Sequence, residues 1–249
     1  MKALLRLLGL VLLAGLGLQL YFVARVALMA VLDPESTTFQ RSEAYLVVKH
    51  TGTLKWRQQW LPYANLSENL KRAVIASEDA SFVVHDGVDL EALEKAWEKN
   101  ARAEQRAAQA GSRLAPSQSA RAGAKPPKII GGSTITQQLA KNLFLSGERT
   151  LLRKGEELLL SLLLEALLSK QRILEIYLNN VEWGEGIFGA EAAAQHYYRK
   201  PAARLSAYEA ARLAVMLPRP KYFETRPNSA YLASRAGTIT ARMGGVELP

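Results

Sequence analysis

The chain begins with a long stretch in which charge does not interrupt the hydrophobic side chains. Residues 7–24 contain no charged side chain, and Gln19 is their polar exception. As an α-helix this stretch would rise roughly 27 Å, close to the hydrocarbon thickness of a bilayer. Lys2 and Arg6 precede it and favour a cytoplasmic N-terminus. The pattern therefore predicts a transmembrane anchor within residues 1–32.

A cleaved signal peptide is the alternative for this stretch. Signal peptides have a shorter apolar region that ends at a cleavage site flanked by small residues. No such site closes the apolar run before Arg25. The comparison favours an uncleaved anchor, with everything after Asp33 facing outward, in the periplasm or an equivalent space.

Helical spacing of apolar side chains dominates the remainder of the chain, so we expect a mainly α fold. The first expected helix begins at Ser67 and runs into Glu78. Further helices are expected at residues 90–110, 134–145, 153–168, 170–180, 190–198 and 206–216.

The other stretches carry weaker patterns. Residues 33–44 read as a linker, and residues 44–59 as a short β-hairpin. Residues 183–189 are a glycine-rich aromatic turn. Residues 111–128 combine positive charge with Gly, Ser and Pro, which predicts a flexible basic loop. Residues 226–249 are expected to form a C-terminal tail.

Composition narrows the chemistry. The formal net charge is +9 and the isoelectric point is about 9.7, which permits anionic lipids, phosphates or nucleic acids as partners. The chain has no cysteine, which excludes disulfides and thiolate metal sites. It has three histidines and no HExxH pattern, so a histidine-rich zinc site is not expected.

Glu78 is the first candidate for a reactive group. It ends an apolar, helix-compatible run and is followed directly by Asp79, with His85 one to two turns beyond. From these residues alone Glu78 fits an acid, a base or a surface charge equally well.

A second candidate site lies around residues 131–141. Thr134 and Gln137 have the spacing of a capping box, after Gly131 and Gly132. A helix that begins this way can offer backbone N–H groups to an anion, and Lys141 would add a positive charge. A well-capped helix with no ligand explains the same pattern.

Further along, Arg153 and Glu157 are four residues apart and so share a helix face, where a surface ion pair is the simplest interpretation.

Together these stretches resemble the conserved blocks of glycosyltransferase family 51, the peptidoglycan glycosyltransferases. The blocks are Glu78-Asp79-x-x-Phe82-x-x-His85-x-Gly87, Gly131-Gly132-Ser133-Thr134-Ile135-Thr136-Gln137-Gln138-Leu139-x-Lys141-Asn142, Arg153-Lys154-x-x-Glu157, Lys170-x-x-Ile173-Leu174-Glu175-x-Tyr177-Leu178-Asn179 and Glu209-Ala210-Ala211-x-Leu213-Ala214-x-x-Leu217-Pro218-x-Pro220. The resemblance covers roughly residues 45–225, and five ordered blocks make it specific.

The resemblance implies a lysozyme-like helical glycosyltransferase domain over residues 45–225, behind a single transmembrane helix. With one anchor and no space for a transpeptidase domain, the chain resembles the monofunctional enzymes. The implied substrate is lipid II, a disaccharide-pentapeptide joined by pyrophosphate to a polyprenol. The implied reaction moves the growing glycan from undecaprenyl pyrophosphate to the 4-hydroxyl of the GlcNAc of lipid II, with inversion to a β-1,4 bond.

The same resemblance implies roles for individual residues. Glu78 would be the base that takes the acceptor proton, and Glu157 the second catalytic carboxylate. The implied substrate-binding residues are Asp79, Phe82, His85, Ser133, Thr134, Gln137, Gln138, Lys141, Asn142, Arg153 and Lys154. Of these, His85 and Asp79 are expected to support the site rather than to transfer protons.

No cofactor is required, although a divalent cation (Mg²⁺ or Mn²⁺) with the pyrophosphate is compatible with the resemblance. The implied partners are lipid II, the nascent glycan strand and membrane lipids. Other cell-wall synthesis or division proteins are candidate partners, and nucleic acid is not. The implied location is the bacterial inner membrane, with a single span and a periplasmic catalytic domain.

Two other functions remain open at this point. A lysozyme-like glycosidase could use Glu78 and Glu157 to cut glycan. A non-catalytic basic membrane protein could act as a scaffold for the cell-wall machinery, with the 111–128 loop as its functional part. The nature of the product from lipid II distinguishes all three.

Overall fold

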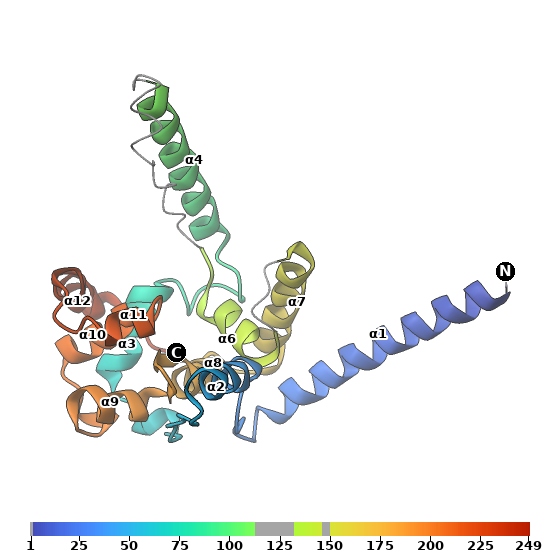
Figure 1. Ribbon diagram of the computed structural model, residues 1–249, viewed down its shortest axis with the longest axis horizontal. Coiled ribbons are helices and arrows are strands. Elements are labelled where there is room, and N and C mark those ends of the chain that lie inside the picture. Colours follow the sequence, from blue (N-terminus) through green and yellow to red (C-terminus); the bar gives the residue numbers. More distant parts are fainter. Residues whose placement is uncertain (1, 113–131, 146–149) are drawn as a thin grey trace. The chain divides into compact units, whose positions relative to one another are not determined.

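The computed structural model describes residues 2–112, 132–145 and 150–249. The chain divides into two compact units, one made of residues 1–88 and 134–249 and the other of residues 89–133. The described residues are mainly helical, as the apolar spacing predicts (Figure 1). Apart from residues 111 and 112, which end a helix, the predicted 111–128 loop lies outside the described residues.

Helix α1 spans Lys2–Leu28 and contains the predicted apolar stretch. Its length and hydropathy suit a membrane span, and none of its most apolar segment is buried against the rest of the protein. Length and composition therefore suggest a membrane anchor. Only the C-terminal end of α1 joins the protein core, through Val26 and the following Met29.

Helix α2, Thr38–Thr51, replaces the hairpin and most of the linker that we expected before residue 60. The prediction was wrong because the alternation of apolar residues hid strong helix ends. Thr37 and Gln40 form a capping box, and Gly52 ends the helix in the left-handed conformation. The Gln40 side chain also donates to the carbonyl of Asn180 at 3.0 Å, which anchors the start of α2.

Three helices, α3 (Glu68–Glu78), α10 (Ala207–Met216) and α12 (Ala230–Arg242), pack together in the first unit (Figure 1). The contact faces carry small and aliphatic side chains such as Ala73 and Ala210, which allow close approach. Helix α12 lies in the segment that we expected to be a tail. That expectation was wrong because Leu232, Ala236 and Ile239 repeat at helical spacing and are buried. Between α10 and α12 lies the short helix α11, Pro220–Glu224.

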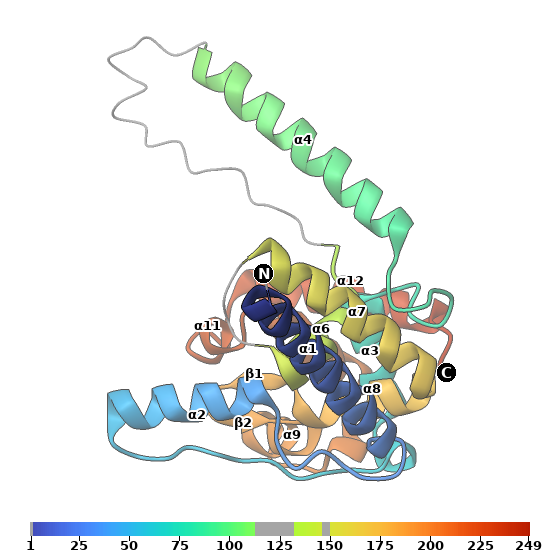
Figure 2. The ribbon, with the colours of Figure 1, turned by 90° about the vertical axis from the view of Figure 1, so that its right-hand side faces the viewer.

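A second group contains α6 (Ile135–Phe144), α7 (Leu151–Leu167) and α8 (Lys170–Asn180). Figure 2 shows α7 beside α1, which it contacts. The predicted capping box of α6 is present, and its apolar side chains Ile135, Leu139, Ala140 and Leu143 are buried as expected. Helix α7 instead leaves several leucines exposed, including Leu152 and Leu159.

The glycine-rich stretch after α8 forms a small hairpin rather than an irregular turn. Strand β1, Glu182–Gly184, pairs antiparallel with β2, Ile187–Phe188, and helix α9, Ala190–Tyr198, follows. Gly189 between them has φ +82°, and an added Cβ would lie 2.6 Å from the carbonyl oxygen of Asn179. A side chain at this position would force the hairpin away from α8.

Short 3₁₀ turns at Tyr63–Asn65, Ala202–Arg204 and Met243–Gly245 complete the first unit.

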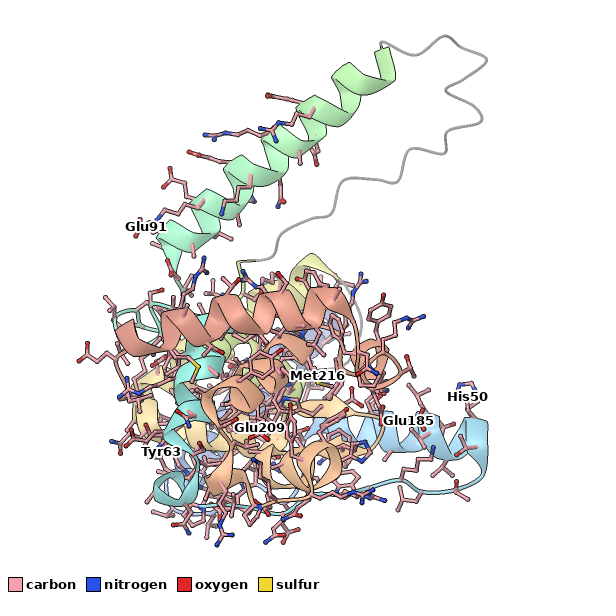
Figure 3. The ribbon with its side chains drawn as sticks, turned by 90° about the vertical axis from the view of Figure 1, so that its left-hand side faces the viewer. His50, Tyr63, Glu91, Glu185, Glu209 and Met216 are labelled. Carbon is pink, nitrogen blue, oxygen red and sulfur yellow. The ribbon has the colours of Figure 1, made fainter. Side chains whose placement is uncertain are left out.

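The second unit contains helix α4, Leu90–Ser112, two residues longer than expected. The Asp89 carboxylate accepts from the backbone N–H of Ala92 at 2.7 Å and so caps its first turn. Ion pairs between residues four apart, such as Glu98 with Arg102, lie along its exposed surface. Figure 3 labels Glu91 in the first turn of this helix.

The buried carboxyl of Glu182 gives the fold a predicted pH dependence. Burial, together with nearby Glu43 and Glu224 and despite Lys221, raises the pKa of Glu182 to about 7. The folded state therefore retains a proton that the unfolded state loses, so stability falls as pH rises from about 4.5 to about 7. We expect this decline, on the order of 3 kcal/mol, to be largely absent from Glu182→Gln in chemical unfolding at a series of pH values.

Glu185→Gln is the matched control, because Glu185 is an exposed carboxylate of the same hairpin, paired with Lys55. Its variant should keep the decline of the wild type. A Glu182→Gln profile that runs parallel to the wild type would contradict the buried, proton-retaining carboxyl.

Candidate functional site

Glu78 is the last residue of α3, and the helix itself positions its carboxylate. Residues 73–76 of α3 are buried, which fixes the helix in the core, and the chain then turns at Asp79. The backbone N–H of Asp79 still bonds to the carbonyl of Ile75 at 2.9 Å. The helix thus ends at Glu78, where the predicted helix also ends.

Two side chains hold the Glu78 carboxylate. Gln138, from α6, donates from Nε2 to Glu78 Oε2 at 3.1 Å, and Ser77 donates to Oε1 at 3.4 Å. The hydroxyl of Tyr177, from α8, donates to Gln138 Oε1 at 2.9 Å, which turns the amide so that its NH₂ faces Glu78. Three helices therefore set the orientation of one partly exposed carboxylate.

Burial raises the pKa of Glu78, although the hydrogen bonds from Gln138 and Ser77 act in the opposite direction. Desolvation disfavours the charged form, and two neutral donors do not replace the lost water fully. The carboxylate is consequently more basic than an exposed glutamate, which suits a group that accepts a proton during a reaction.

Asp79 occupies the N-terminus of α6. Its Oδ2 accepts the backbone N–H of Ile135 at 2.9 Å, and its two oxygens lie 2.9 and 3.1 Å from His85 Nε2. His85 Nδ1 accepts the N–H of Gly87 at 3.1 Å, so Nε2 carries the hydrogen that Asp79 accepts. The helix start that we considered as an anion-binding site therefore donates a backbone N–H to the protein's own carboxylate.

Thr134 joins the loop after Asp79 to α6 through its hydroxyl, which donates to the carbonyl of Gly87 at 2.6 Å. Gly87 has φ +86°, and a Cβ there would lie 3.1 Å from Glu165 Cγ. Both the backbone conformation and the space favour glycine at this position. The Thr134 bond thus holds the loop against the start of α6.

Lys170 and Glu165 are supporting residues whose part the sequence did not reveal. The Lys170 ammonium donates to the carbonyl of His85 at 2.6 Å and to Glu165 at 2.8 Å, and lies 4.6 Å from the ring centre of Phe82. Glu165 also accepts from the hydroxyl of Thr136 at 2.6 Å. The sequence signal that could have indicated this role of Glu165 is its charge within the leucine-rich run of α7.

Glu157 forms a second charged group at the start of α7. Arg153 Nη1 lies 3.4 Å from its carboxylate, and Lys154 also pairs with it. The side chain of Glu157 is 5% exposed and that of Arg153 17%, so this pair is largely buried and not the surface ion pair considered above, whereas Lys154 is 51% exposed. Within the described residues, the buried Nε of Arg153 has no hydrogen-bond partner.

Several of the residues that we expected to bind substrate are buried in the structure. Phe82 is fully buried, Thr134 and Gln137 serve the cap of α6, and Asn142 lies in the core. Direct contact with a substrate is therefore not expected of these four, because they present little or no surface. Asp79 and His85 support the loop, as we expected.

The remaining candidates keep accessible surface. Gln138 is half-buried, Lys141 and Lys154 are exposed, and Ser133, which belongs to the second unit, is exposed as well. Lys141 follows Gln138 by three residues on α6, so the two share a face of that helix. Helices α6 and α7 pack against each other. Helix α6 carries Gln138, which contacts Glu78, and α7 carries Glu157 with its two cations.

Comparisons with known proteins give a consistent result. A protein-family profile described as Transglycosylase matches residues 47–123 and 120–244. The chain is 52% identical to a biosynthetic peptidoglycan transglycosylase of Burkholderia thailandensis over 95% of this chain and 84% of the relative. The proteins with the same description in Burkholderia pseudomallei and Burkholderia orbicola are 50% and 48% identical, over 95% of this chain and 84% and 87% of theirs.

The Asp79 contacts predict the effect of one amide substitution. In Asp79→Asn one carboxylate oxygen becomes an NH₂ group, which cannot accept a hydrogen bond. The remaining oxygen can accept from the Ile135 N–H or from His85 Nε2–H, but the NH₂ group cannot replace the other acceptor. One buried donor is left unpaired, so we expect the free energy of unfolding to fall by about 1–3 kcal/mol. Chemical unfolding in detergent measures this loss.

Asp86→Asn serves as the control, because Asp86 is exposed in the same loop. It should leave the unfolding free energy within about 0.5 kcal/mol of the wild type. Equal stability of the two variants would show that Asp79 does not hold α6.

Proposed function

The chain belongs to the transglycosylase family, and we propose how its residues carry out the reaction of that family. It is a peptidoglycan glycosyltransferase that polymerises glycan strands, as the match over most of the chain and the half-identical relatives indicate. Lipid II and the growing glycan are accordingly its substrates. The roles of individual residues, the metal requirement and the orientation in the membrane are proposals.

Glu78 is the general base in this proposal, and the observation that carries it is the way its carboxylate is held. One oxygen accepts from Gln138, which Tyr177 orients, while burial raises the pKa of the group. A positioned carboxylate of increased basicity can take the proton of a sugar hydroxyl, whose own acidity is very low, as the new bond forms.

The reaction is then an inverting displacement at the donor sugar. Glu78 takes the proton of the acceptor GlcNAc 4-hydroxyl, and that oxygen attacks the anomeric carbon of the donor MurNAc. The bond from this carbon to the phosphate oxygen breaks, and its electron pair leaves with the polyprenyl pyrophosphate. Attack from the opposite face converts the α-linked phosphate into a β-1,4 glycosidic bond.

Lys141, Arg153 and Lys154 stabilise the leaving pyrophosphate in this proposal. Arg153 and Lys154 are held by Glu157, so the carboxylate orients the cations and limits their repulsion. The unpartnered Nε of Arg153 supports a phosphate contact, because phosphate oxygens are suitable acceptors for a guanidinium N–H. Charges held in place before the reaction stabilise the negative charge as it develops.

The residues do not form an evident protein site for a divalent cation. Among the residues that the structure describes, no group of three His, Asp or Glu side chains is arranged to bind a metal ion. Glu157 is already paired with two cations. A contribution of Mg²⁺ or Mn²⁺ with the pyrophosphate stays a prediction, and no step above depends on it.

The two alternative functions fit these observations less well. A glycosidase that cuts glycan with Glu78 and Glu157 would need Glu157 near the scissile bond, but Arg153 and Lys154 already neutralise it. A non-catalytic scaffold would not need a Glu78 carboxylate held by three helices. The named relatives are biosynthetic enzymes, which also favours polymerisation.

We further propose that α1 anchors the enzyme in the inner membrane with the catalytic domain in the periplasm. The two positive charges before the span, Lys2 and Arg6, support a cytoplasmic N-terminus. The leucines exposed on α7, which contacts α1, suit a surface close to the bilayer, where a lipid-linked substrate is presented.

Glu78→Gln tests the base. The amide cannot accept the proton, so we expect glycan polymerisation from labelled lipid II to fall about 10²–10⁴-fold. The folded state disfavours the charged form of Glu78, so the neutral variant should be at least as stable as the wild type at pH 8. Polymerisation and thermal unfolding are measured on the same preparation.

Glu247→Gln is the control, because Glu247 is an exposed carboxylate near the C-terminal end of the chain. It should polymerise lipid II at the wild-type rate. If Glu78→Gln kept near-wild-type polymerisation, Glu78 would not be the base. Release of cut fragments by the wild type, without elongation, would instead favour the glycosidase.

The absence of cysteine allows a direct test of orientation. A single cysteine introduced as Glu247→Cys should react with a membrane-impermeant maleimide in cells whose outer membrane is permeabilised, because it would face the periplasm. Ala3→Cys, which keeps both Lys2 and Arg6, should react only after the inner membrane is disrupted. The reverse pattern would contradict the proposed orientation.

A further inference from the structure

A cavity lies where α1 ends and the chain turns toward α2. Its volume is about 330 Å³, and its walls include both apolar and charged side chains. Leu28 and Leu32 supply apolar surface, and Arg25, Glu35, Ser36 and Arg41 supply polar groups. None of these residues takes part in the glycosyl transfer proposed above.

The position of the cavity relates it to the membrane, if α1 is the anchor proposed above. Arg25 is the first charged residue after the apolar stretch, so it marks the depth at which the helix reaches the headgroups. Tyr21 lies one turn before it, with its hydroxyl 3.3 Å from Arg25 Nη1. An aromatic residue beside a cation at the end of a span is typical of the membrane interface.

Arg172, from α8, holds the chain segment that forms the cavity. It donates to the carbonyls of Met29 at 2.7 Å and Leu32 at 2.9 Å, and pairs with Asp33 at 2.8 Å. Its side chain is 14% exposed, and the contact with Met29 is partly buried, whereas those with Leu32 and Asp33 lie at the surface. The turn is therefore attached to the catalytic domain, and Arg172 already neutralises one of the acidic residues of the cavity.

The charges that remain are two cations and one anion. Arg41, which lines the cavity, donates from Nη1 to the carbonyl and hydroxyl of Ser36 at 3.1 and 2.9 Å and from Nη2 to the hydroxyl of Thr38 at 3.2 Å. A guanidinium has five N–H donors, so two remain for a ligand. Arg25 likewise uses one nitrogen for Tyr21. Glu35 is exposed, and its carboxylate has no ion-pair partner within the described part of the chain.

We propose that this cavity binds the headgroup of a zwitterionic aminophospholipid of the phosphatidylethanolamine type. The phosphodiester lies between Arg25 and Arg41, because guanidinium groups bind phosphate oxygens with paired hydrogen bonds. The primary ammonium pairs with Glu35, Leu28 and Leu32 line the cavity beside the headgroup, and the acyl chains run back along the apolar part of α1 that precedes Arg25.

The charge pattern favours this headgroup over the other common ones. A phosphatidylglycerol headgroup has the phosphate but no cation, so Glu35 would face an anionic lipid without a counter-charge. A phosphatidylcholine headgroup has a cation, but its quaternary nitrogen has no N–H to donate to the carboxylate. Only the aminophospholipid satisfies the arginines and Glu35 together.

The test measures lipid bound to the full-length chain in detergent by native mass spectrometry. Dihexanoyl phosphatidylethanolamine, phosphatidylglycerol and phosphatidylcholine are added separately at equal concentrations. We expect one tightly bound phosphatidylethanolamine per chain, with an affinity about tenfold above those of the other two lipids. Arg25→Gln should weaken binding of phosphatidylethanolamine and of phosphatidylglycerol, because both use the phosphate contact.

Glu35→Gln separates the headgroups. Removing the carboxylate should lower the affinity for phosphatidylethanolamine and raise that for phosphatidylglycerol, so that the preference is lost or reversed. Arg242→Gln and Glu247→Gln are charge-matched controls at exposed positions outside the cavity, and each should bind as the wild type does.

The proposal would be overturned by equal wild-type affinity for the three lipids, or by unchanged lipid preference in Glu35→Gln and Arg25→Gln. Circular dichroism confirms that the variants are folded. Polymerisation of lipid II in detergent is measured in parallel and should be retained in both variants. Loss of the lipid preference with retained polymerisation therefore tests the cavity proposal alone. An error in the proposed membrane anchor would instead appear in the cysteine labelling experiment.

Discussion

The bond between the Asp79 carboxylate and the start of α6 is the contact on which the site depends. One oxygen of Asp79 accepts the backbone N–H of Ile135, and both lie close to His85 Nε2. This single side chain joins the end of α3 to α6 and to the loop that follows. Because Gln138 is on α6 and Glu78 ends α3, the same contact helps to determine how the Glu78 carboxylate meets the Gln138 amide.

Charged groups around this contact divide into those that are buried and hold the structure and those that keep accessible surface. Asp79, Glu165 and Lys170 are buried or largely buried and fully engaged with loop and helix atoms. Glu78 retains partial exposure, and Lys154 is half-exposed beside Glu157. Keeping a desolvated carboxylate such as Glu78 lowers stability at neutral pH, and its helices compensate by burying apolar residues in the core.

Two arginines, Arg153 and Arg172, differ in how their guanidinium donors are used. Arg153 lies beside Glu157 with a buried Nε that has no partner among the described atoms, which suits an incoming phosphate. Arg172 instead uses its donors on the turn after α1. These bonds attach the turn after α1 to α8, which would suit the proposed anchor of an enzyme whose substrate is held in the bilayer by its lipid.

The sequence by itself determined the apolar N-terminal helix, the cap of α6, helices α8 to α10 and the order of the family blocks, because these depend on local spacing and local hydrogen bonds. It also singled out Glu78. We did not predict α2 or α12 from it, although local signals were present: the capping box of Thr37 and Gln40 for α2, and the helical spacing of Leu232, Ala236 and Ile239 for α12. Only the tertiary structure showed that Asp79 takes the anion position of α6, that Phe82 is buried, and that Glu165 and Lys170 support the loop. These contacts join residues 29 to 85 positions apart, and no local pattern of side chains encodes such a meeting.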